Sequence, residues 1–217
     1  MPTGNFGDIF AGYAAKRMGL PIDKLVIATN ENDILARCLA TGAYRLGDVT
    51  PTASPSMDIQ VSSNFERLLF EAHRRDAEAV VTLMDSLATS GEFVIEGAAL
   101  KAIRADFVAG RADQGEGAET IRETYRRTGF LADPHTAVGL AVADRFRDPA
   151  IPMVTLATAH PAKFPEAVEA ASGISPSLPA GFADQLGRAE HFKTIANDRA
   201  AVEAFITTRT RAVAEKV

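Results

Sequence analysis

Apolar positions in the first part of the chain change their period twice, and these changes predict the order of its elements. Residues 6–18 carry apolar side chains at helical spacing. A short continuous apolar run follows at 24–29, as expected for a buried parallel strand. Residues 33–42 return to helical spacing, with Asn30 or Asn32 available to cap the helix. This alternation predicts an α/β fold with a parallel sheet.

The middle of the chain has a largely helical pattern that follows one long irregular connection. Residues 47–64 are rich in Pro, Ser and Thr, and long loops of this kind often carry function. Helical spacing then recurs in the segments 64–75, 76–90, 96–105, 118–129 and 133–148. Residues 110–117 are predicted as a loop, and the apolar run 152–158 is predicted as a second strand.

A change in composition near the end of the chain predicts a boundary. After Ser172 the sequence becomes rich in Pro and Ser, and residues 197–213 resume a helical pattern. The length of 217 residues suits one domain with a smaller appendage. We therefore expect residues 1–175 to form the main domain and residues 176–217 to form a C-terminal extension that packs on it.

The overall composition is that of an acidic globular protein. Hydrophobic residues make up 47% of the chain, the net charge is −5, and there is no tryptophan. An acidic chain with few aromatic residues is a poor partner for nucleic acid. No apolar segment approaches the ~20 residues that span a bilayer, so we expect no membrane association. The single cysteine, Cys38, can form no internal disulfide and fits both a cytoplasmic location and a small core position.

The stretch PTGNFGD at 2–8, just before the first predicted helix, is the strongest local candidate for a binding site. Gly4 and Gly7 bracket Asn5 and Phe6, and glycine permits close approach of a ligand to the backbone. The helix that follows directs its first N–H groups and its dipole at the turn, which favours an anion such as phosphate. The turn lacks the lysine of a Walker loop, and a plain glycine-rich helix start is the alternative interpretation.

A few further polar residues lie where ligands bind in α/β proteins. Thr158 and His160 lie at the end of the predicted strand 152–158, and ligands bind beyond the carboxyl ends of parallel strands. Both could equally be turn residues that satisfy the backbone. His135 lies at a predicted helix start, and Arg67 in a first helical turn either faces an anion or is simply solvated. No set of His, Cys, Asp and Glu has zinc spacing, and no GxSxG elbow occurs.

Four longer segments together resemble threonine synthase. They read PTGNFGD, PSMDIQVSSNFERLLF, TGFLADPHTAVG and TAHPAKFPE, and they occur in that family's order between residues 2 and 166. The resemblance implies a three-layer, parallel-sheet α/β fold of PLP fold type II, similar to the tryptophan synthase β subunit. It also implies conversion of O-phospho-L-homoserine and water to L-threonine and phosphate, with pyridoxal 5′-phosphate (PLP) as cofactor. Residues 1–175 would then be the C-terminal part of the PLP-dependent catalytic domain.

The resemblance also implies roles for two sets of residues. The cofactor set holds the PLP phosphate and approaches the pyridine nitrogen, and it comprises Gly4, Asn5, Phe6, Gly7 and Thr158. The substrate set lies in the segment 62–67 and at the helix start near 133, and it comprises Ser63, Asn64, Arg67 and His135. A hydroxyl partner leaves the pyridine nitrogen less readily protonated than a carboxylate would.

One motif of the family is missing from the sequence. In this family the lysine that forms the Schiff base with PLP lies N-terminal to the glycine turn, in a segment of the type FKD, which this chain lacks. The lysines of the chain are Lys16, Lys24, Lys101, Lys163, Lys193 and Lys216. Lys163 lies near Thr158 in sequence, but in a different motif. We therefore expect the catalytic lysine upstream of residue 1, and PLP binding by this chain that is weak or absent.

These observations support two interpretations of the chain. In the first, it is the C-terminal part of a larger enzyme that acts on O-phospho-L-homoserine, and it is inactive alone. Loss of neighbouring strands would expose a sheet edge and apolar surface, which favours dimerisation. In the second, the chain is a complete non-catalytic module that binds a phosphorylated metabolite or a protein partner.

Overall fold

The computed structural model describes residues 1–210. Its contacts divide the chain into two units, Met1–Ser177 and Leu178–Val217. The division falls close to the change in composition after Ser172. Packing of residues 176–217 on the main domain stays a prediction.

The second unit contains short helical elements. They are the 3₁₀ turns η3 (Ala180–Phe182) and η4 (Gln185–Gly187) and the helix α9 (Arg199–Thr207). Asp198 caps α9 by accepting a hydrogen bond from the Ala201 amide at 2.9 Å. The helical pattern at 197–213 is thus confirmed for its first part, and residues 211–213 lie outside the described residues.

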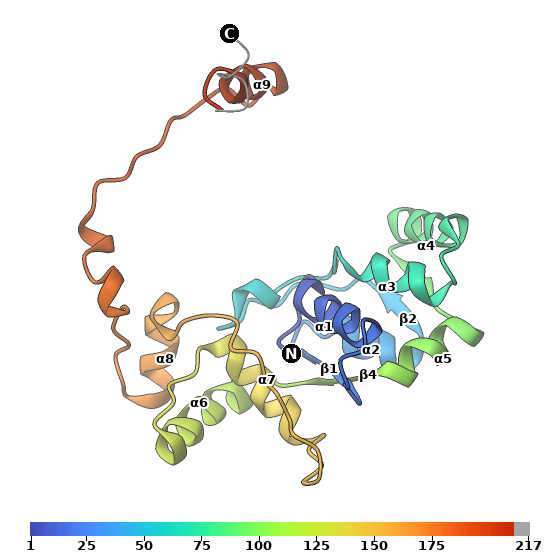
Figure 1. Ribbon diagram of the computed structural model, residues 1–217, viewed down its shortest axis with the longest axis horizontal. Helices are drawn as coiled ribbons and strands as arrows, with labels where there is room; N and C mark the ends of the chain where they lie inside the picture. Colours follow the sequence, from blue (N-terminus) through green and yellow to red (C-terminus); the bar gives the residue numbers. More distant parts are fainter. Residues whose placement is uncertain (211–217) are drawn as a thin grey trace. The chain divides into compact units, whose positions relative to one another are not determined.

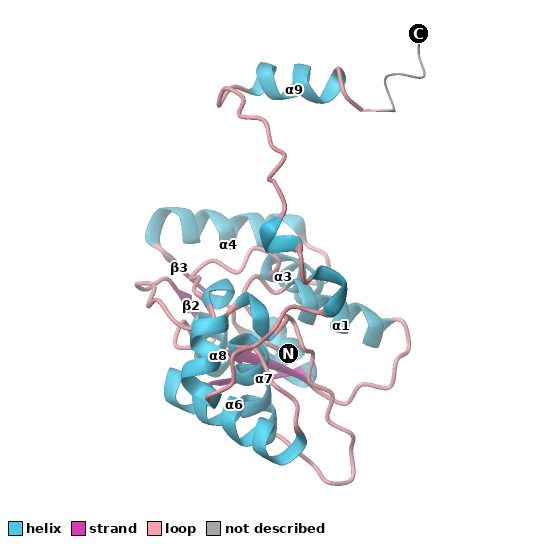
Figure 2. Cartoon of the chain, turned by 90° about the vertical axis from the view of Figure 1, so that its left-hand side faces the viewer, coloured by secondary structure: helices cyan, strands magenta, loops and turns pink. Residues whose placement is uncertain are grey.

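The first unit alternates helices with short strands (Figure 2). Its helices are α1 (Gly7–Arg17), α2 (Ile34–Thr41), α3 (Phe65–Ala72), α4 (Ala77–Ser90), α5 (Gly97–Asp106), α6 (Gln114–Thr128), α7 (Pro134–Asp144) and α8 (Pro165–Ser172). Its strands are β1 (Leu25–Thr29), β2 (Ala43–Arg45), β3 (Glu92–Val94) and β4 (Phe107–Arg111), and its 3₁₀ turns are η1 (Pro55–Met57) and η2 (Pro161–Lys163). In the described part of the chain, no helix is both long enough and apolar enough to cross a bilayer.

A parallel pair of strands, β1 and β4, lies at the centre of the first unit (Figure 1). The pairing covers the whole of β1 and begins with Leu25 opposite Phe107. Residues 1–3 lie along the other edge of β1, where the Thr3 amide donates to the Ala28 carbonyl at 2.8 Å. Both edges of β1 are therefore occupied, and all of its residues are buried.

The two faces of β1 pack against different layers of helices. Leu25 and Ile27 point into a core completed by α1, α2 and α3. Val26 and Ala28 point into a second core with Val142 of α7. Because alternate residues of a strand point to opposite faces, the sheet separates two helical layers. The predicted three-layer α/β fold is confirmed.

The side chains of Asn30 and Asn32 hold the long loop 47–64 at the carboxyl end of β1. Both are buried, and their Nδ2 groups donate to Asp58 Oδ1 at 2.7 and 3.0 Å. Neither caps α2, which follows Asp33 without a side-chain cap. The predicted capping role is wrong because the buried amide groups find their partners in the loop.

Several elements have only a weak signal in the sequence. The short antiparallel pair of β2 and β3 is held by Tyr44 stacked on Phe93, with ring centroids 4.8 Å apart. The predicted loop at 110–117 is wrong, since it contains the end of β4 and the start of α6. Asp113 and Glu116 form a capping box that starts α6 earlier than the apolar spacing indicates.

Residues 152–158, predicted as a second strand, form no strand in this structure. No strand pairs with them in the described chain, and Val154 is 74% exposed. Backbone N–H and C=O groups of an extended segment need a neighbouring strand to form a ladder. The apolar pattern alone does not make a strand here, because no strand pairs with this segment within the described residues.

Candidate functional site

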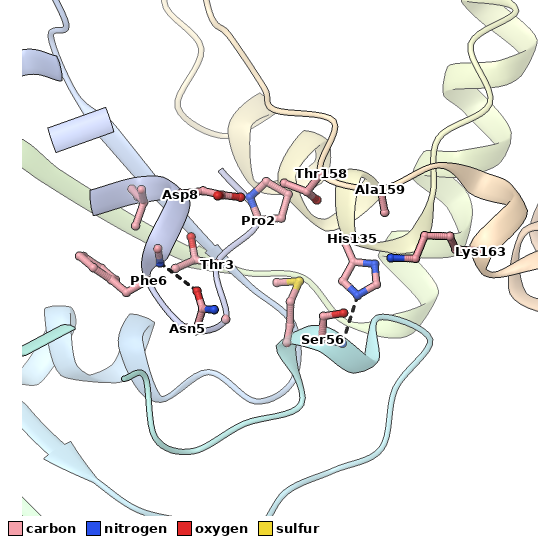
Figure 3. A pocket seen from close by; sticks show the side chains of 14 residues that line it. Pro2, Thr3, Asn5, Phe6, Asp8, Ser56, His135, Thr158, Ala159 and Lys163 are labelled. Carbon is pink, nitrogen blue, oxygen red and sulfur yellow. Dashed lines mark hydrogen bonds between the residues drawn. The ribbon is translucent and has the colours of Figure 1, made fainter. Parts of the chain in front are cut away.

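The glycine turn, residues 4–7, leads from the edge of β1 into α1. Phe6 has φ 70° and ψ 6°, a left-handed conformation that is uncommon outside glycine. Its side chain is 1% exposed, and its ring lies 5.2 and 5.9 Å from those of Phe65 and Phe107. Asn5 Oδ1 accepts a hydrogen bond at 2.9 Å from the amide two residues further on (Figure 3). Aromatic packing and this bond hold the turn in its strained shape.

The carbonyl groups of the glycine turn point towards the segment that leads into α3. Ser62 Oγ donates to the Gly4 carbonyl at 2.8 Å, and Asn64 donates to the Asn5 carbonyl from both its backbone nitrogen and Nδ2, at 2.9 Å each. In a trans peptide the N–H group points opposite to the preceding carbonyl. The amides of Asn5 and Phe6 therefore point away from α3, and they have no acceptor in the described part of the chain.

The first turn of α1 adds further amides to this site. Asp8 and Ile9 have no acceptor for their backbone N–H groups within the residues that the structure describes. Their helical acceptors would be the carbonyls of Gly4 and Asn5, which are bonded to the segment before α3 instead. Successive unpaired amides at the positive end of a helix form a binding site for an anion, here called the phosphate seat. These residues line a cavity of about 220 Å³.

The 3₁₀ turn η1 packs directly against the glycine turn. A Cβ atom added at Gly4 would lie 2.6 Å from the Ser56 carbonyl oxygen, closer than atoms can approach. Glycine is therefore required at this position by the contact of two backbone segments. A Cβ atom at Gly7 would lie 3.1 Å from Asn5 Oδ1, so a larger side chain there would disturb the bond that shapes the turn.

The remaining wall of the cavity comes from the segment after the expected strand. Thr158, Ala159 and Lys163 line the cavity, and the Lys163 side chain extends towards His135 (Figure 3). In the described residues, no other lysine lines it. His160 does not line the cavity and accepts a hydrogen bond from a nearby amide through Nδ1, in agreement with its interpretation as a turn residue.

His135 lies in the cavity wall and is 4% exposed. Its Nδ1 lies 3.0 Å from Asp133 Oδ1, and its Nε2 accepts a hydrogen bond from the Ser56 amide at 3.2 Å (Figure 3). Its ring centroid lies 4.7 Å from that of Phe164. Burial raises the pKa of Asp133, but hydrogen bonds from His135 and Thr136 outweigh burial, and the pKa of this carboxyl lies below its usual value.

The structure gathers only some of the residues expected in the site. Those that line the cavity are Gly4, Asn5, Phe6, Gly7, His135 and Thr158. Ser63, Asn64 and Arg67 do not line it, and Arg67 is exposed, as expected for a solvated arginine. Asn64 instead holds the glycine turn.

Sequence reasoning did not identify Ser56, Met57 and Asp133 as part of this site. Ser56 and Met57 line the cavity, and Asp133 orients His135. The only signal was indirect, because the long loop was expected to carry function and Asp133 begins the motif at the helix start. Their partners are remote in sequence, so local patterns could not reveal them.

Two other expectations concern metals and the cysteine. The described residues contain no group of three or more His, Cys, Asp and Glu side chains that could hold a metal ion. Cys38 is 1% exposed within the core beneath β1, and burial raises its pKa to about 12. This agrees with its expected role as a small core residue.

Comparison with known proteins gives consistent matches. The family model described as "Threonine synthase, C-terminal" matches residues 136–206. The threonine synthase of Pseudomonas aeruginosa is 49% identical over 95% of this chain and 45% of its own length. A crystal structure of PLP-bound threonine synthase from Brucella melitensis matches with a TM-score of 0.89 and 56% identity, over 97% of this chain and 45% of that one. The yeast enzyme matches with a TM-score of 0.82 and 40% identity, over 99% and 47%.

These matches identify the fold class, and within it the group of enzymes that the chain resembles. The three-layer fold with its glycine turn is that of the PLP-dependent α/β enzymes of fold type II. Within that class, the chain is similar to the C-terminal part of threonine synthases, and the resemblance noted in the sequence is confirmed. The chain spans about half the length of the relatives that it matches.

Proposed function

We propose that this chain supplies the C-terminal part of a threonine synthase activity, and that it carries the seat for the cofactor phosphate. The whole activity converts O-phospho-L-homoserine and water to L-threonine and phosphate. The observation that carries the proposal is the set of unpaired amides at the glycine turn and the start of α1, in a cavity of about 220 Å³. Backbone amides with a helix N-terminus favour a phosphate without help from a lysine.

The residues around the cavity fit PLP. The glycine turn offers amides to the phosphate, and Thr158 in the same cavity offers a neutral hydroxyl suited to the pyridine nitrogen. When bound, the cofactor supplies an electron sink for bond cleavage at the amino acid substrate. Asn5 keeps the turn in shape through its bond to the Gly7 amide, so its side chain acts on the cofactor through the backbone.

The substrate side of the site is a separate proposal. Ser63 and Arg67 are exposed and lie in the segment that leads into α3, next to the residues that hold the glycine turn. An exposed guanidinium is suited to the phosphate of O-phospho-L-homoserine. Both residues therefore remain candidates for binding the substrate, with Asn64 as a support for the turn.

The reactive amine is expected from polypeptide outside this chain. Lys163 is the alternative source, since it lines the cavity. It follows the Thr158 motif, however, and not a segment that precedes the glycine turn. We therefore propose that Lys163 is not the amine that binds PLP.

Reconstitution with an upstream segment tests the proposal. The chain would be co-expressed with the part of the Pseudomonas aeruginosa threonine synthase that lies N-terminal to the matched region, and phosphate release from O-phospho-L-homoserine would be measured. We expect activity in the mixture and none from either part alone. Lys163→Ala should retain Schiff-base formation in the mixture, whereas Gly7→Val should weaken PLP binding.

Two results would contradict this assignment. Activity of the chain alone that disappears in Lys163→Ala would assign the amine to Lys163. Tight binding of inorganic phosphate by the chain, with no change in activity or affinity when the upstream segment is added, would favour a non-catalytic module for a phosphorylated metabolite.

We also propose a cytoplasmic location and self-association of the chain when it is expressed alone. An acidic composition with one buried thiol supports the location. The exposed apolar side chains of Ile151, Met153, Val154 and Leu156 support association, because such patches favour contacts between copies. Light scattering on the chain with and without the upstream segment tests the second point.

A further inference from the structure

His135 contacts three separate segments of the chain. Its Nδ1 bonds to Asp133 at the start of α7, and its Nε2 bonds to Ser56 in η1. Its ring packs on Phe164, which precedes α8. His135 is 4% exposed and joins these three segments, which raises the question of what it does there.

The two hydrogen bonds of His135 fix its protonation state. The Asp133 carboxylate can only accept, so Nδ1 carries the proton. The Ser56 amide can only donate, so Nε2 carries none. Both ring nitrogens are thus used by the protein, and neither can donate to a ligand without breaking one of these bonds.

The backbone of Ser56 connects His135 to the glycine turn. Its N–H group is held by Nε2, and its carbonyl oxygen lies against the Cα of Gly4, where even a methyl group would not fit. Ser62 holds the Gly4 carbonyl at 2.8 Å. The glycine turn is therefore placed between η1 and the segment before α3, and His135 supports the η1 contact.

We propose that His135 is a positioning residue for the phosphate seat: its Nε2 holds η1 against Gly4, and it does not itself bind the substrate. This proposal depends on the proposed function only for the claim that the bound anion is the phosphate group of PLP. The contact chain from Asp133 through His135 and Ser56 to Gly4 stands on the structure alone.

A matched pair of substitutions separates the two bonds of His135. His135→Gln places an acceptor where Nε2 lies and can keep the Ser56 bond. His135→Asn places a donor where Nδ1 lies and keeps only the Asp133 bond. The chain would be studied by exchange of the hydrogen-bonded amides of Thr3, Gly7 and Met57, and by titration with PLP and with inorganic phosphate.

We expect exchange of the Thr3, Gly7 and Met57 amides to rise about tenfold in His135→Asn and less than threefold in His135→Gln. Where the unmodified chain binds PLP or phosphate, affinity should fall in the same order. Equal effects of the two variants would overturn the proposal, as would faster exchange confined to α7. Normal exchange in His135→Asn with lost PLP binding would instead assign direct ligand contact to His135.

Ser56→Pro provides a second test that leaves the histidine in place. It removes the N–H donor, so the Thr3, Gly7 and Met57 amides should exchange as fast as in His135→Asn, and the double variant should add nothing further. Additive effects would show that the two residues act independently and would contradict the proposal. Because exchange is measured without ligand, a reconstituted mixture without activity would refute the proposed function and still leave this proposal tested.

Discussion

β1 and residues 152–158 have the same kind of apolar sequence, and only one of them is a strand. β1 is paired along both edges and fully buried, whereas Val154 in the other segment is 74% exposed. Each run ends in a threonine, which is Thr29 in β1 and Thr158 in the other segment. The difference teaches that an apolar pattern is not enough to make a strand, because a neighbouring strand decides whether the segment joins a sheet.

The two regions also form different walls of the cavity. The β1 side carries the glycine turn, whose shape is fixed by contacts within this chain. The wall at Thr158 and Ala159 continues from the unpaired segment. We therefore expect the phosphate seat to depend on this chain and the pyridine side to depend on polypeptide from elsewhere.

The largest expected effect comes from shortening matched apolar side chains in the two regions. Ile27→Ala, at a fully buried position, should lower the free energy of unfolding by about 2–5 kcal/mol. Val154→Ala, at an exposed position, should change it by less than about 0.5 kcal/mol. Urea unfolding followed by circular dichroism measures both. Similar losses in the two variants would mean that residues 152–158 are packed in solution.

A second substitution tests how closely the β1 side is packed around the phosphate seat. Gly4→Ala should lower the free energy of unfolding by about 1–3 kcal/mol, because its Cβ would overlap the Ser56 carbonyl. Gly117→Ala is the control, since no atom lies within 4 Å of its added Cβ. That change in α6 should stabilise the chain by up to about 1 kcal/mol. Equal behaviour of the two variants would argue against the backbone contact at Gly4.

Adding the upstream segment should change one region and leave the other as it is. We expect amide exchange at residues 152–158 to slow at least about tenfold, or 1.4 kcal/mol, as a partner strand forms its ladder. Exchange in β1 should not change, since both of its edges are occupied already. Slower exchange in β1 alone would contradict the expectation that residues 152–158 gain the partner strand.

The smallest expected effect is a pH dependence carried by Asp133. Its pKa in the folded chain is lowered, so its stabilising contribution is complete above the unfolded value of about 3.9. The contribution should be lost as the pH falls through the lower folded pKa. Unfolding curves of the parent chain and Asp133→Asn between pH 3 and pH 7 should converge at the acidic end. A constant difference across this range would contradict the lowered pKa.

The sequence predicts those parts of the fold that depend on neighbouring residues. The helix after the glycine turn and the buried run of β1 have local patterns, and both are present. The segment 152–158 failed because pairing is a contact with another strand. Asn30 was misassigned for a similar reason, since its amide bonds to a loop that follows α2 and not to the helix beside it.

The residues of the site could be predicted where their signal is local, and could not where it depends on contacts remote in sequence. The glycine turn and Thr158 were found from the motif, and the structure puts them around one cavity. The support of His135 by Ser56 was not found, because the two residues are 79 positions apart. The capping of α7 by Asp133 was visible as an Asp-Pro start, but its bond to the histidine ring was not.

The left-handed backbone of Phe6 affects the thermodynamics of ligand capture. Its ring is locked among aromatic neighbours from α3 and β4, so the loss of chain entropy in the turn accompanies folding and not binding. An anion entering the seat meets amides that are already aligned. The receptor is thus preorganised, and an anion that binds there incurs little further cost in ordering the turn.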